Sequence, residues 1–534
     1  MRVFVAIGML LMLSSPVSAA LTEGDEARPL GRELVRQLEE EGDVLRAFYD
    51  ARDTRPAWQE DERVAAFAAA LHTLERDGLD PQDYRPDHLL AQYRQLAADD
   101  REARARFELA ASRTLLTALE HLQRGKVDPH AIDPDWEVPI EPPELDLAGV
   151  SQAIDGQRFE QAFEQARPDY APYERLRTGL ARYRNIQRLG GWPTLPEREV
   201  ALRPGDVHAD VELLRQRLAI IGELEVMAVD SAAFPGAAQD APETHRYDAS
   251  LEAAVKRFQR RHLLEVDGIV GRKTRAALNV PVARRIDQIR LNLERARWLL
   301  HGLPEVFVLV DIAGYRLSYF RPGGEIWRSR IVVGRPYRRT PSLRSEITHL
   351  TVNPSWTIPP TIRREDVLPK VRQDLGYLWR ERIQVLSPGG EPLDPWAIDW
   401  SRPGNVILRQ APGPNNALGR VVIRFPNDHL VYLHDTPAQG LFAREQRAFS
   451  SGCIRVEQAE SFAQRLLDDT GTERDLAALI ASGNTRNVSL ARHVPVVLHY
   501  WTVHPAEDGA LAFRPDIYDR DDALLEALDR PLAL

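Results

Sequence analysis

The spacing of apolar residues divides the chain into a helical first part and a later part rich in strands. Between residues 25 and 200, apolar side chains recur every three or four positions, for example from Arg101 to Leu122, which predicts amphipathic helices. The short breaks between these segments contain Gly and Pro, as in Asp77 to Pro81, and predict turns. We therefore expect residues 25–200 to form a helical domain, in which the sequence reveals no catalytic group.

Residues 204–281 have a second helical pattern, short enough for a small unit of its own. An amphipathic helix is predicted from Val211 to Leu218, and a second helix ends near Phe258. Gly268 and Gly271 suit a tight turn before a short third helix. The pattern therefore predicts a compact three-helix domain, which a charged helix then connects to the rest of the chain.

At Glu305 the period of the apolar residues changes to that of strands. The predicted strands are Val306–Val310, Tyr315–Phe320, Ile326–Val333, Ile347–Val352, Val421–Phe425, Leu430–His434 and Val494–Trp501. Residues 362–414 interrupt them with three tryptophans and several Pro and Gly residues, and an insert of this length is usually functional or disordered. Its aromatic residues argue against disorder. We expect a mostly β domain over residues 303–505, with 362–414 inserted, and a C-terminal extension at 506–534.

The N-terminus has the pattern of a secretory signal peptide. An apolar run from Val3 to Leu13 follows Met1-Arg2, and small residues then suit cleavage after Ala19. The apolar run is too short for an ordinary membrane span. We predict a signal peptide at residues 1–19 and a periplasmic protein; an uncleaved N-terminal anchor in the inner membrane is the alternative.

Composition narrows the possible functions. The chain has 534 residues, enough for three or four domains, and its net charge of -10 gives no reason to expect nucleic acid as a partner. A single cysteine excludes an intramolecular disulfide. The sequence contains no Gly-rich phosphate loop and no His-Glu-x-x-His motif, so we expect neither a cofactor nor a metal.

The single cysteine, Cys453, lies nineteen residues after His434, and such a pair is a candidate nucleophile and base. Gly452 leaves room beside the sulfur, and the backbone N–H groups of Gly452 and Cys453 could form an oxyanion hole. Arg455 brings a positive charge that favours thiolate. Tyr432 lies two residues before His434, on the same strand face, and could line the site or belong to the core. The alternative for Cys453 is a buried, unreactive side chain.

The segment Ser450-Ser451-Gly452-Cys453-Ile454-Arg455, with His434 before it, resembles the catalytic motif of the L,D-transpeptidases of bacterial cell walls. The family commonly has a histidine where this chain has Ser451, which leaves His434 as the only nearby base. The 204–281 region resembles a small peptidoglycan-binding domain through Asp267-Gly268 and Gly271-x-x-Thr274. Residues 25–200 resemble the helical scaffold of large Gram-negative members.

The resemblance implies a multidomain α+β protein with a helical scaffold, a peptidoglycan-binding-like domain and a mostly β catalytic domain that carries a capping subdomain. It implies Cys453 as nucleophile, His434 as proton acceptor and Gly452 as a backbone oxyanion donor. Supporting or substrate-binding roles are expected for Arg455, Ser450, Ser451, Tyr432 and Trp356. The expected reaction is 3→3 cross-linking of peptidoglycan, in cell-wall biogenesis and cell shape. Expected partners are stem peptides, glycan and other cell-wall synthesis enzymes.

Other functions stay open on the sequence alone. A cell-wall cysteine peptidase would use the same Cys453 and His434 to hydrolyse the bond, although papain-like folds place the cysteine before the histidine. A sortase places the histidine first, with another spacing and motif. A non-catalytic wall-binding protein would depend on residues 204–281 alone. The acceptor amine could belong to a second stem peptide or to a lipoprotein that is being tethered.

Overall fold

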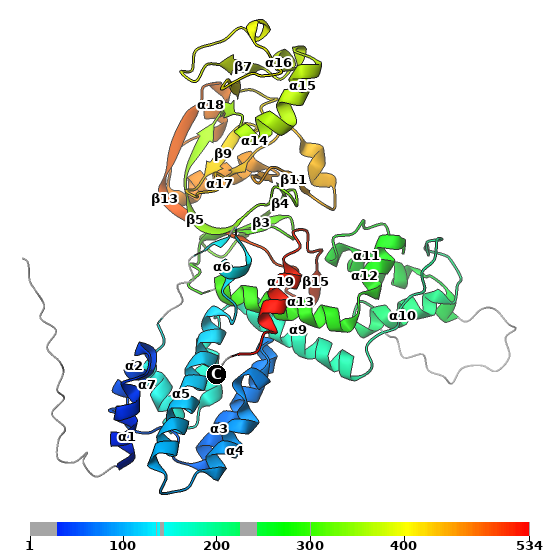
Figure 1. Ribbon diagram of the computed structural model, residues 1–534. Coiled ribbons are helices and arrows are strands. Elements are labelled where there is room, and N and C mark those ends of the chain that lie inside the picture. The colour runs from blue at the N-terminus through cyan, green and yellow to red at the C-terminus, as the bar shows by residue number, and fades with distance from the viewer. Residues whose placement is uncertain (1–28, 135, 139–143, 225–242, 300, 533–534) are drawn as a thin grey trace, which may run out of the picture. The chain divides into compact units, whose positions relative to one another are not determined.

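The computed structural model describes residues 29–134, 136–138, 144–224, 243–299 and 301–532. The predicted signal peptide, residues 1–19, lies outside these ranges. The described chain forms two compact units: the first comprises residues up to Leu71 together with Arg85–Ala118 and Leu145–Ala162, and the second comprises the remainder (Figure 1). Within the described ranges, no helix is both long and apolar enough to cross a membrane.

The first unit is helical, as the spacing of its apolar residues predicts. Its core contains stacked aromatic rings: Trp58 lies 4.7 Å from Phe67 and 5.7 Å from Phe159, measured between ring centroids. An ion pair of 2.8 Å joins the buried Arg52 to Asp155. The helices are α1 (Pro29–Leu38), α2 (Asp43–Asp50), α4 (Pro86–Gln95) and α7 (Leu147–Asp155), with most of α3 (Asp61–His72) and α5 (Arg101–Arg124).

In the second unit, the region predicted as a three-helix domain contains α10 (Asp210–Ile220), α11 (Ala249–Arg261) and α12 (Arg272–Asn279) around one apolar core. Gln259 fixes the turn between the last two helices. Its side-chain oxygen accepts the Gly268 N–H at 2.9 Å, and its amide donates to Asp267 at 2.8 Å. Gly268 has a φ of +76°, in the left-handed region that favours glycine. The Asp-Gly signature is therefore explained by the geometry of this turn.

Two long helices of the second unit, α9 (Ala171–Arg188) and α13 (Val282–Leu299), pack against each other, and α13 precedes the strand-rich region. Several polar side chains of α13 are buried, which its sequence alone does not reveal. Arg297 pairs with Glu294 and donates to the hydroxyl of Tyr173 on α9 at 3.0 Å. Arg297 also donates to the carbonyl oxygen of Asp77 at 2.9 Å, and such additional hydrogen bonds offset part of the cost of burying an ion pair.

Strands from Phe307 onward, joined by the short β1 from earlier in the chain, form a ten-stranded sheet in the order β1-β5-β13-β2-β3-β4-β12-β10-β9 with β11 beside β4. An additional pairing of β9 with β5 closes the path into a ring. The strands are β1 (Trp136–Glu137), β2 (Phe307–Asp311), β3 (Arg316–Phe320), β4 (Ile326–Gly334), β5 (Ser342–Val352), β9 (Val421–Arg424), β10 (Leu433–His434), β11 (Ala448–Ser450), β12 (Ile454–Val456) and β13 (Arg486–His499). Closure leaves few unpaired strand edges and encloses one core.

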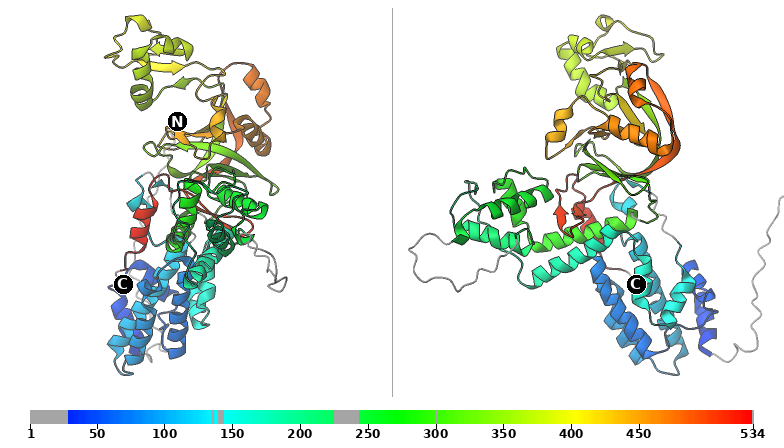
Figure 2. Two further views of the ribbon diagram at one scale, coloured as in Figure 1. Left: turned by 90° about the vertical axis from the view of Figure 1, so that its right-hand side faces the viewer. Right: turned by 180° about the vertical axis from the view of Figure 1, so that it is seen from behind.

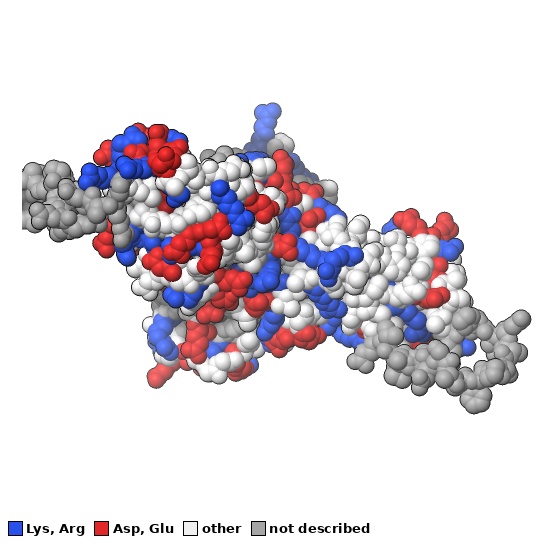
Figure 3. All heavy atoms as spheres, turned by 90° about the horizontal axis from the view of Figure 1, so that it is seen from below, with Lys and Arg blue, Asp and Glu red and all other residues white. Residues whose placement is uncertain are grey.

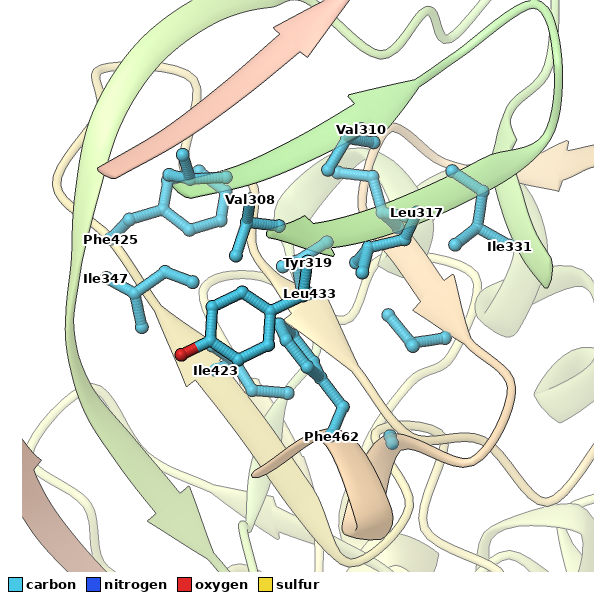
Figure 4. Packing of buried hydrophobic residues seen from close by; sticks show 14 of the residues in the cluster. Val308, Val310, Leu317, Tyr319, Ile331, Ile347, Ile423, Phe425, Leu433 and Phe462 are labelled. Carbon is cyan, nitrogen blue, oxygen red and sulfur yellow. The ribbon is translucent and has the colours of Figure 1, made fainter. Parts of the chain in front are cut away.

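The core of this closed sheet consists of alternate residues from each strand. Figure 4 shows side chains such as Val308, Leu317 and Leu433 directed toward one another, and Phe462 joins them from helix α17 (Ala459–Thr470). Strand β13 curves along the sheet with α17 beside it (Figure 2). Because side chains alternate along a strand, every residue next to a core position points to the opposite face.

One predicted strand is shorter in the structure. The sequence predicts a strand from Leu430 to His434, but β10 begins only at Leu433. Leu430 has a φ of +55° and is 80 % exposed, so it cannot continue a strand. The Asn427 side chain closes the preceding loop by hydrogen bonds with the backbone N–H and C=O of Val431. The predicted strand is therefore wrong for its first residues, because the backbone of Val431 forms hydrogen bonds with the Asn427 side chain instead of with a neighbouring strand.

The inserted region forms a small subdomain, which we call the cap. It has a three-stranded sheet in the order β6-β8-β7 and an apolar core of its own. The strands are β6 (Trp356–Thr357), β7 (Ile383–Leu386) and β8 (Ile407–Gln410), and the helices are α14 (Pro360–Ile362), α15 (Leu368–Gln373) and α16 (Gly376–Arg380). Two tryptophans on the cap are exposed, Trp379 and Trp396. The cap sheet includes β6, although β6 precedes residue 362, where the predicted insert begins.

Candidate active site

The predicted catalytic residues lie on one face of two neighbouring strands. Strands β10 and β12 are parallel, with Leu433 opposite Ile454 and His434 opposite Arg455. Leu433 and Ile454 are fully buried in the core. The alternation of side chains therefore places Tyr432, His434, Cys453 and Arg455 together on the opposite face. The structure thus brings the predicted nucleophile and base to the same surface of the sheet.

His434 is buried, and its hydrogen bond defines which ring nitrogen is free. Nδ1 lies 2.5 Å from the carbonyl oxygen of Asp435, so this nitrogen carries the proton and donates. Nε2 is then the basic nitrogen. Burial and, to a smaller extent, the charge of Arg455 lower the pKa of His434 to about 3. The imidazole is therefore neutral near pH 7, as a proton acceptor must be.

Cys453 is half-buried, and its thiol is the protonated form near neutral pH. Burial raises the pKa of Cys453, while hydrogen bonds from Tyr432 and the charges of Arg424 and Arg455 lower it by less. The sequence predicts that Arg455 favours thiolate, and the arginine does act in that direction, but burial outweighs it. The thiol lies 4.0 Å from the carbonyl oxygen of Leu430. The resting pair is therefore a neutral thiol with a neutral imidazole.

The loop before Cys453 is held by the hydroxyl of Ser450. Ser450 Oγ donates to the carbonyl oxygen of Cys453 at 2.5 Å and accepts the N–H of Gly452 at 3.2 Å. Gly452 has a φ of +114°, which a side chain would strain. The Gly452 N–H, predicted as an oxyanion donor, is thus already engaged. Within the described ranges the Cys453 N–H makes no hydrogen bond to the protein, so this amide is the available donor.

Thr340 and Tyr518 support this loop, and sequence reasoning missed both. Thr340 Oγ1 donates to the carbonyl oxygen of Gly452 at 2.7 Å. The Tyr518 hydroxyl donates to the carbonyl oxygen of Gly334 at 2.8 Å and accepts the Thr340 N–H at 3.1 Å. Tyr518 comes from the C-terminal extension and is fully buried. Its partners are nearly two hundred residues away in the chain, and no local pattern indicates such a contact.

Arg338 connects the loop before Cys453 with the cap, and it too was missed. One of its terminal nitrogens lies 2.6 Å from Asp366 and 2.7 Å from the hydroxyl of Ser451. The other lies 2.6 Å from Glu365. We call this set of four residues the cap latch. Ser451, predicted as a supporting residue at the family's histidine position, is exposed and serves here as an acceptor for the arginine.

Tyr432 and Trp356 lie against the thiol side of the site. Burial raises the pKa of Tyr432, the neighbouring Cys453 raises it further, and a hydrogen bond with the Trp356 side chain opposes the shift. Arg424 of β9 lies over the Tyr432 ring, 4.6 Å from its centroid. Of the two interpretations of Tyr432, the lining of the site fits this position, because its side chain shares the face of His434. Trp356 belongs to β6 and thus brings the cap sheet to the site.

The site has the groups for nucleophilic chemistry and an excess of positive charge. Arg424 and Arg455 flank the thiol, and Arg455 Nε is buried without a partner. Such groups suit a substrate carboxylate or a developing negative charge. Among the described residues there is no cluster of His, Cys, Asp or Glu that could hold a metal ion.

Comparisons with known proteins agree with this arrangement. Three family models match the chain: "Scaffold domain" at residues 43–180, "Putative peptidoglycan binding domain" at 207–278 and "L,D-transpeptidase catalytic domain" at 305–480. A protein of Haemophilus influenzae named "Putative L,D-transpeptidase" is 39% identical over 218 residues. That alignment covers 40% of this chain and 44% of the relative, so the chain spans less than half of the relative's length in this match.

Two solved structures were also matched at low overall similarity. An L,D-transpeptidase from Mycobacterium smegmatis has 14% identity and a TM-score of 0.19, covering 36% of this chain and 58% of its own. The L,D-transpeptidase (residues 123-326) from Xylanimonas cellulosilytica has 15% identity and a TM-score of 0.18. The match covers 57% of this chain and 100% of that structure's chain.

The matched domains and the site define the class of protein. It combines a region that matches an L,D-transpeptidase catalytic domain with regions that match a scaffold domain and a putative peptidoglycan binding domain. Residues 305–480 are thus similar to the catalytic domain of the L,D-transpeptidase family. The predicted family and fold class are thereby confirmed, whereas the individual roles of Cys453, His434 and their neighbours stay predictions.

Proposed function

We propose that this protein forms 3→3 cross-links in peptidoglycan through a cysteine acyl-enzyme on the tetrapeptide stem of a donor. One observation carries the proposal: Cys453 and His434 share one face of the paired strands β10 and β12, with Leu433 and Ile454 locking the register from the core. Tyr432 and Arg455 complete this face. The matched catalytic domain supports the same class of reaction.

Acylation begins with proton transfer from the Cys453 thiol to Nε2 of His434. The sulfur attacks the carbonyl carbon of the third stem residue, and a tetrahedral intermediate forms. His434 then returns the proton to the leaving amine, the C–N bond breaks, and terminal D-Ala departs. Because the pKa values of the two groups lie in the order thiol above imidazole, the ion pair exists only transiently, and proton transfer accompanies attack.

The negative charge of the intermediate is stabilised by the free N–H of Cys453. A donor aimed at the developing oxyanion is worth about 3 kcal/mol, or two orders of magnitude in rate. The Gly452 N–H, which Ser450 engages at 3.2 Å, would contribute only by exchanging that long hydrogen bond for one to the oxyanion. Arg424 and Arg455 add positive potential on the same face.

Resolution requires the side-chain amine of a second stem, which attacks the thioester and releases Cys453. Water competes for the same thioester, so exclusion of water decides between cross-linking and hydrolysis. We propose that the cap provides this exclusion, held over the site by the cap latch and by Trp356. The peptidoglycan-binding domain at 207–278 would raise the local concentration of the polymer. We propose export to the periplasm, where this substrate lies.

The test is incubation of the purified protein with disaccharide-tetrapeptide, followed by mass spectrometry of the products. We expect cross-linked dimer with loss of D-Ala, and a thioester adduct on Cys453 in the intact protein. A Cys453→Ala variant serves as the control for non-enzymatic product. Tripeptide without dimer would identify a hydrolase instead. Transfer to an added lipoprotein C-terminal lysine peptide, with little dimer, would identify a tethering enzyme. Absence of any turnover or adduct would leave only a wall-binding role.

A further inference from the structure

A second cavity in the same structural unit has an unusual concentration of positive charge. It has a volume of about 410 Å³ and is lined by the end of α11, strands β3 and β4, the start of β11 and the strand pair β14 (Val503–Pro505) and β15 (Leu511–Phe513). Its lining contains seven arginines and one carboxylate, Glu457. The arginines are Arg260, Arg261, Arg316, Arg328, Arg330, Arg447 and Arg514. None of the predicted catalytic or supporting residues lines it.

Four of these arginines have carboxylate partners. Arg330 binds Glu457 through two hydrogen bonds of 2.7 and 2.5 Å, and Arg514 pairs with the buried Asp311. Arg261 pairs both with the buried Glu223 and with the exposed Asp508, the latter at 2.6 Å. Arg328 forms an exposed pair with Glu507 at 3.2 Å.

The remaining three, Arg260, Arg316 and Arg447, form no ion pair within the described part of the chain. Arg447 is buried and donates only to backbone carbonyl oxygens, those of Tyr315, Ile331, Arg444 and Glu445. A carbonyl oxygen satisfies the N–H groups of arginine but does not neutralise its charge.

The register of the sheet makes this concentration of charge costly. Arg316 on β3 lies directly opposite Arg330 on β4, and like charges in such a pair are destabilising. Arg316 donates to Nε2 of His504 at 2.9 Å, which requires that nitrogen to be unprotonated. Its own Nε is buried without a partner. Burial, followed by the charges of Arg514 and Arg316, keeps the pKa of His504 well below its ordinary value. A strained arrangement of this kind is typical of functional sites.

The cavity also differs from the outer surface. On the face drawn in Figure 3, basic and acidic side chains are interspersed, and the chain as a whole has a net charge of -10. A cavity whose lining has a large excess of one sign concentrates the electrostatic potential inside it. Its volume lies within the range of roughly 300–1,000 Å³ that is usual for small-molecule sites.

We propose that this cavity is a binding site for an oxyanion, a ligand that carries two or more carboxylate or phosphate groups. Arg316 and Arg260 bind the ligand directly, one from the sheet and one from the end of α11. Arg447, which is buried in the lining, adds a positive charge that no ion pair of the described residues neutralises. Guanidinium groups bind both carboxylates and phosphates through paired hydrogen bonds, so the shared chemistry is the oxyanion itself. The site thereby joins the peptidoglycan-binding domain to the catalytic domain through a ligand.

The experiment titrates the purified full-length protein by isothermal calorimetry with inorganic pyrophosphate and, separately, with citrate. We expect saturable binding of at least one probe to one site. Arg316→Gln should weaken it roughly tenfold, because a charged hydrogen-bond donor within a partly buried site is removed. Arg260→Gln should weaken it by a smaller factor. Arg486→Gln is the matched control: an exposed arginine of the same domain, on β13 and outside the cavity, whose removal should leave the affinity unchanged.

The two probes distinguish the sources of the ligand chemistry. Binding of pyrophosphate alone supports a phosphate-bearing ligand, and binding of citrate alone supports a carboxylate-bearing one. A melting temperature is measured for each variant, and Arg260→Gln, an exposed position, keeps the test valid if Arg316→Gln fails to fold. The proposal is overturned if neither anion binds, or if Arg260→Gln and folded Arg316→Gln bind as tightly as the unaltered protein. Neither result depends on turnover at Cys453.

Discussion

The strand pair β10 and β12 and the cap belong to the same catalytic domain but are held in place by different kinds of contact. Strands β10 and β12 are part of the closed sheet, and Leu433 and Ile454 lock their register from a fully buried position. The cap has its own sheet and its own core, and the cap latch ties it to the loop before Cys453 through charged hydrogen bonds of 2.6 to 2.7 Å.

This difference predicts how each region responds to change. A strand register is all-or-none, because a slip by one residue would turn Cys453 and His434 into the core. Partly exposed ion pairs contribute only about 1 kcal/mol each, so a cap held by such pairs can move without unfolding the domain. Substitutions in the strand pair should therefore abolish chemistry, whereas substitutions in the latch should reduce it by degrees.

The largest effect is expected from Cys453→Ala, which removes the proposed nucleophile while changing little volume. Acyl-enzyme formation should disappear completely, with the melting temperature within a few degrees of the unaltered protein. Intact-protein mass spectrometry after incubation with tetrapeptide stem measures the adduct. A surviving adduct of the expected mass would place the nucleophile elsewhere and remove the catalytic distinction between the strands and the cap.

His434→Gln tests the second member of the strand pair. Glutamine keeps a donor for the Asp435 carbonyl oxygen but provides no base, so the acylation rate should fall by about 10²- to 10⁴-fold. Stopped-flow or quench measurements with the same stem report the rate. A variant with the rate of the unaltered protein would show that another group accepts the proton from Cys453.

The same substitution predicts a change in the pH dependence of stability. Burial lowers the pKa of His434 to about 3 in the folded protein, while the unfolded chain has an ordinary value near 6.5. Between these values the unfolded state binds the extra proton, so the free energy of unfolding decreases as the pH falls from 6.5 toward 3. The contribution of His434 reaches at most about 5 kcal/mol, at roughly 1.4 kcal/mol per pKa unit.

Urea unfolding of the protein and of His434→Gln is measured at pH 7 and at pH 4. The contribution of His434 is the loss of unfolding free energy between these pH values in the unaltered protein, minus the loss in the variant. Other buried histidines, such as His121 and His499, titrate in both proteins and therefore cancel. Equal loss of stability in the two proteins would show that His434 is not held neutral by burial.

The contrast between the two regions also explains what the sequence could predict. Cys453, His434 and Tyr432 belong to short local patterns, and alternation along a strand is enough to place them on one face. The cap was predicted as an aromatic insert, but the inclusion of Trp356 in its sheet depends on pairing with Gln410, more than fifty residues later. Arg338, Thr340 and Tyr518 have no local signature, because their roles arise from contacts between distant segments. The raised pKa of Cys453 depends on burial, which the sequence does not show. The sequence shows only the nearby charge of Arg455, which lowers that pKa.

Arg338→Ala should open the cap latch and reduce the rate of cross-linking roughly tenfold, since it removes charged hydrogen bonds to Glu365, Asp366 and Ser451. The proportion of hydrolysed tripeptide should rise at the same time, because water reaches the thioester. A double-mutant cycle with Asp366→Asn isolates the ion pair. Arg344→Ala, at an exposed position of the same domain, is the control. An unchanged product ratio in Arg338→Ala would mean that the latch does not govern water access.

The smallest effect is expected from Tyr432→Phe, which removes only a hydroxyl from the face shared by Cys453 and His434. Hydrogen bonding from this side chain lowers the pKa of Cys453 against the larger opposing effect of burial, so its loss should raise that pKa further. The rate of thiol alkylation by iodoacetamide should then rise with pH along a curve displaced to higher pH, and acylation near pH 7 should slow by a few-fold. Tyr319→Phe is the matched control, because Tyr319 belongs to the apolar core of the sheet, where its hydroxyl interacts with Asp469 and not with the site. If both variants give the same alkylation curve as the unaltered protein, Tyr432 has the packing role of an ordinary core residue. The residues that influence Cys453 would then be fewer than the four that the strand register places on one face.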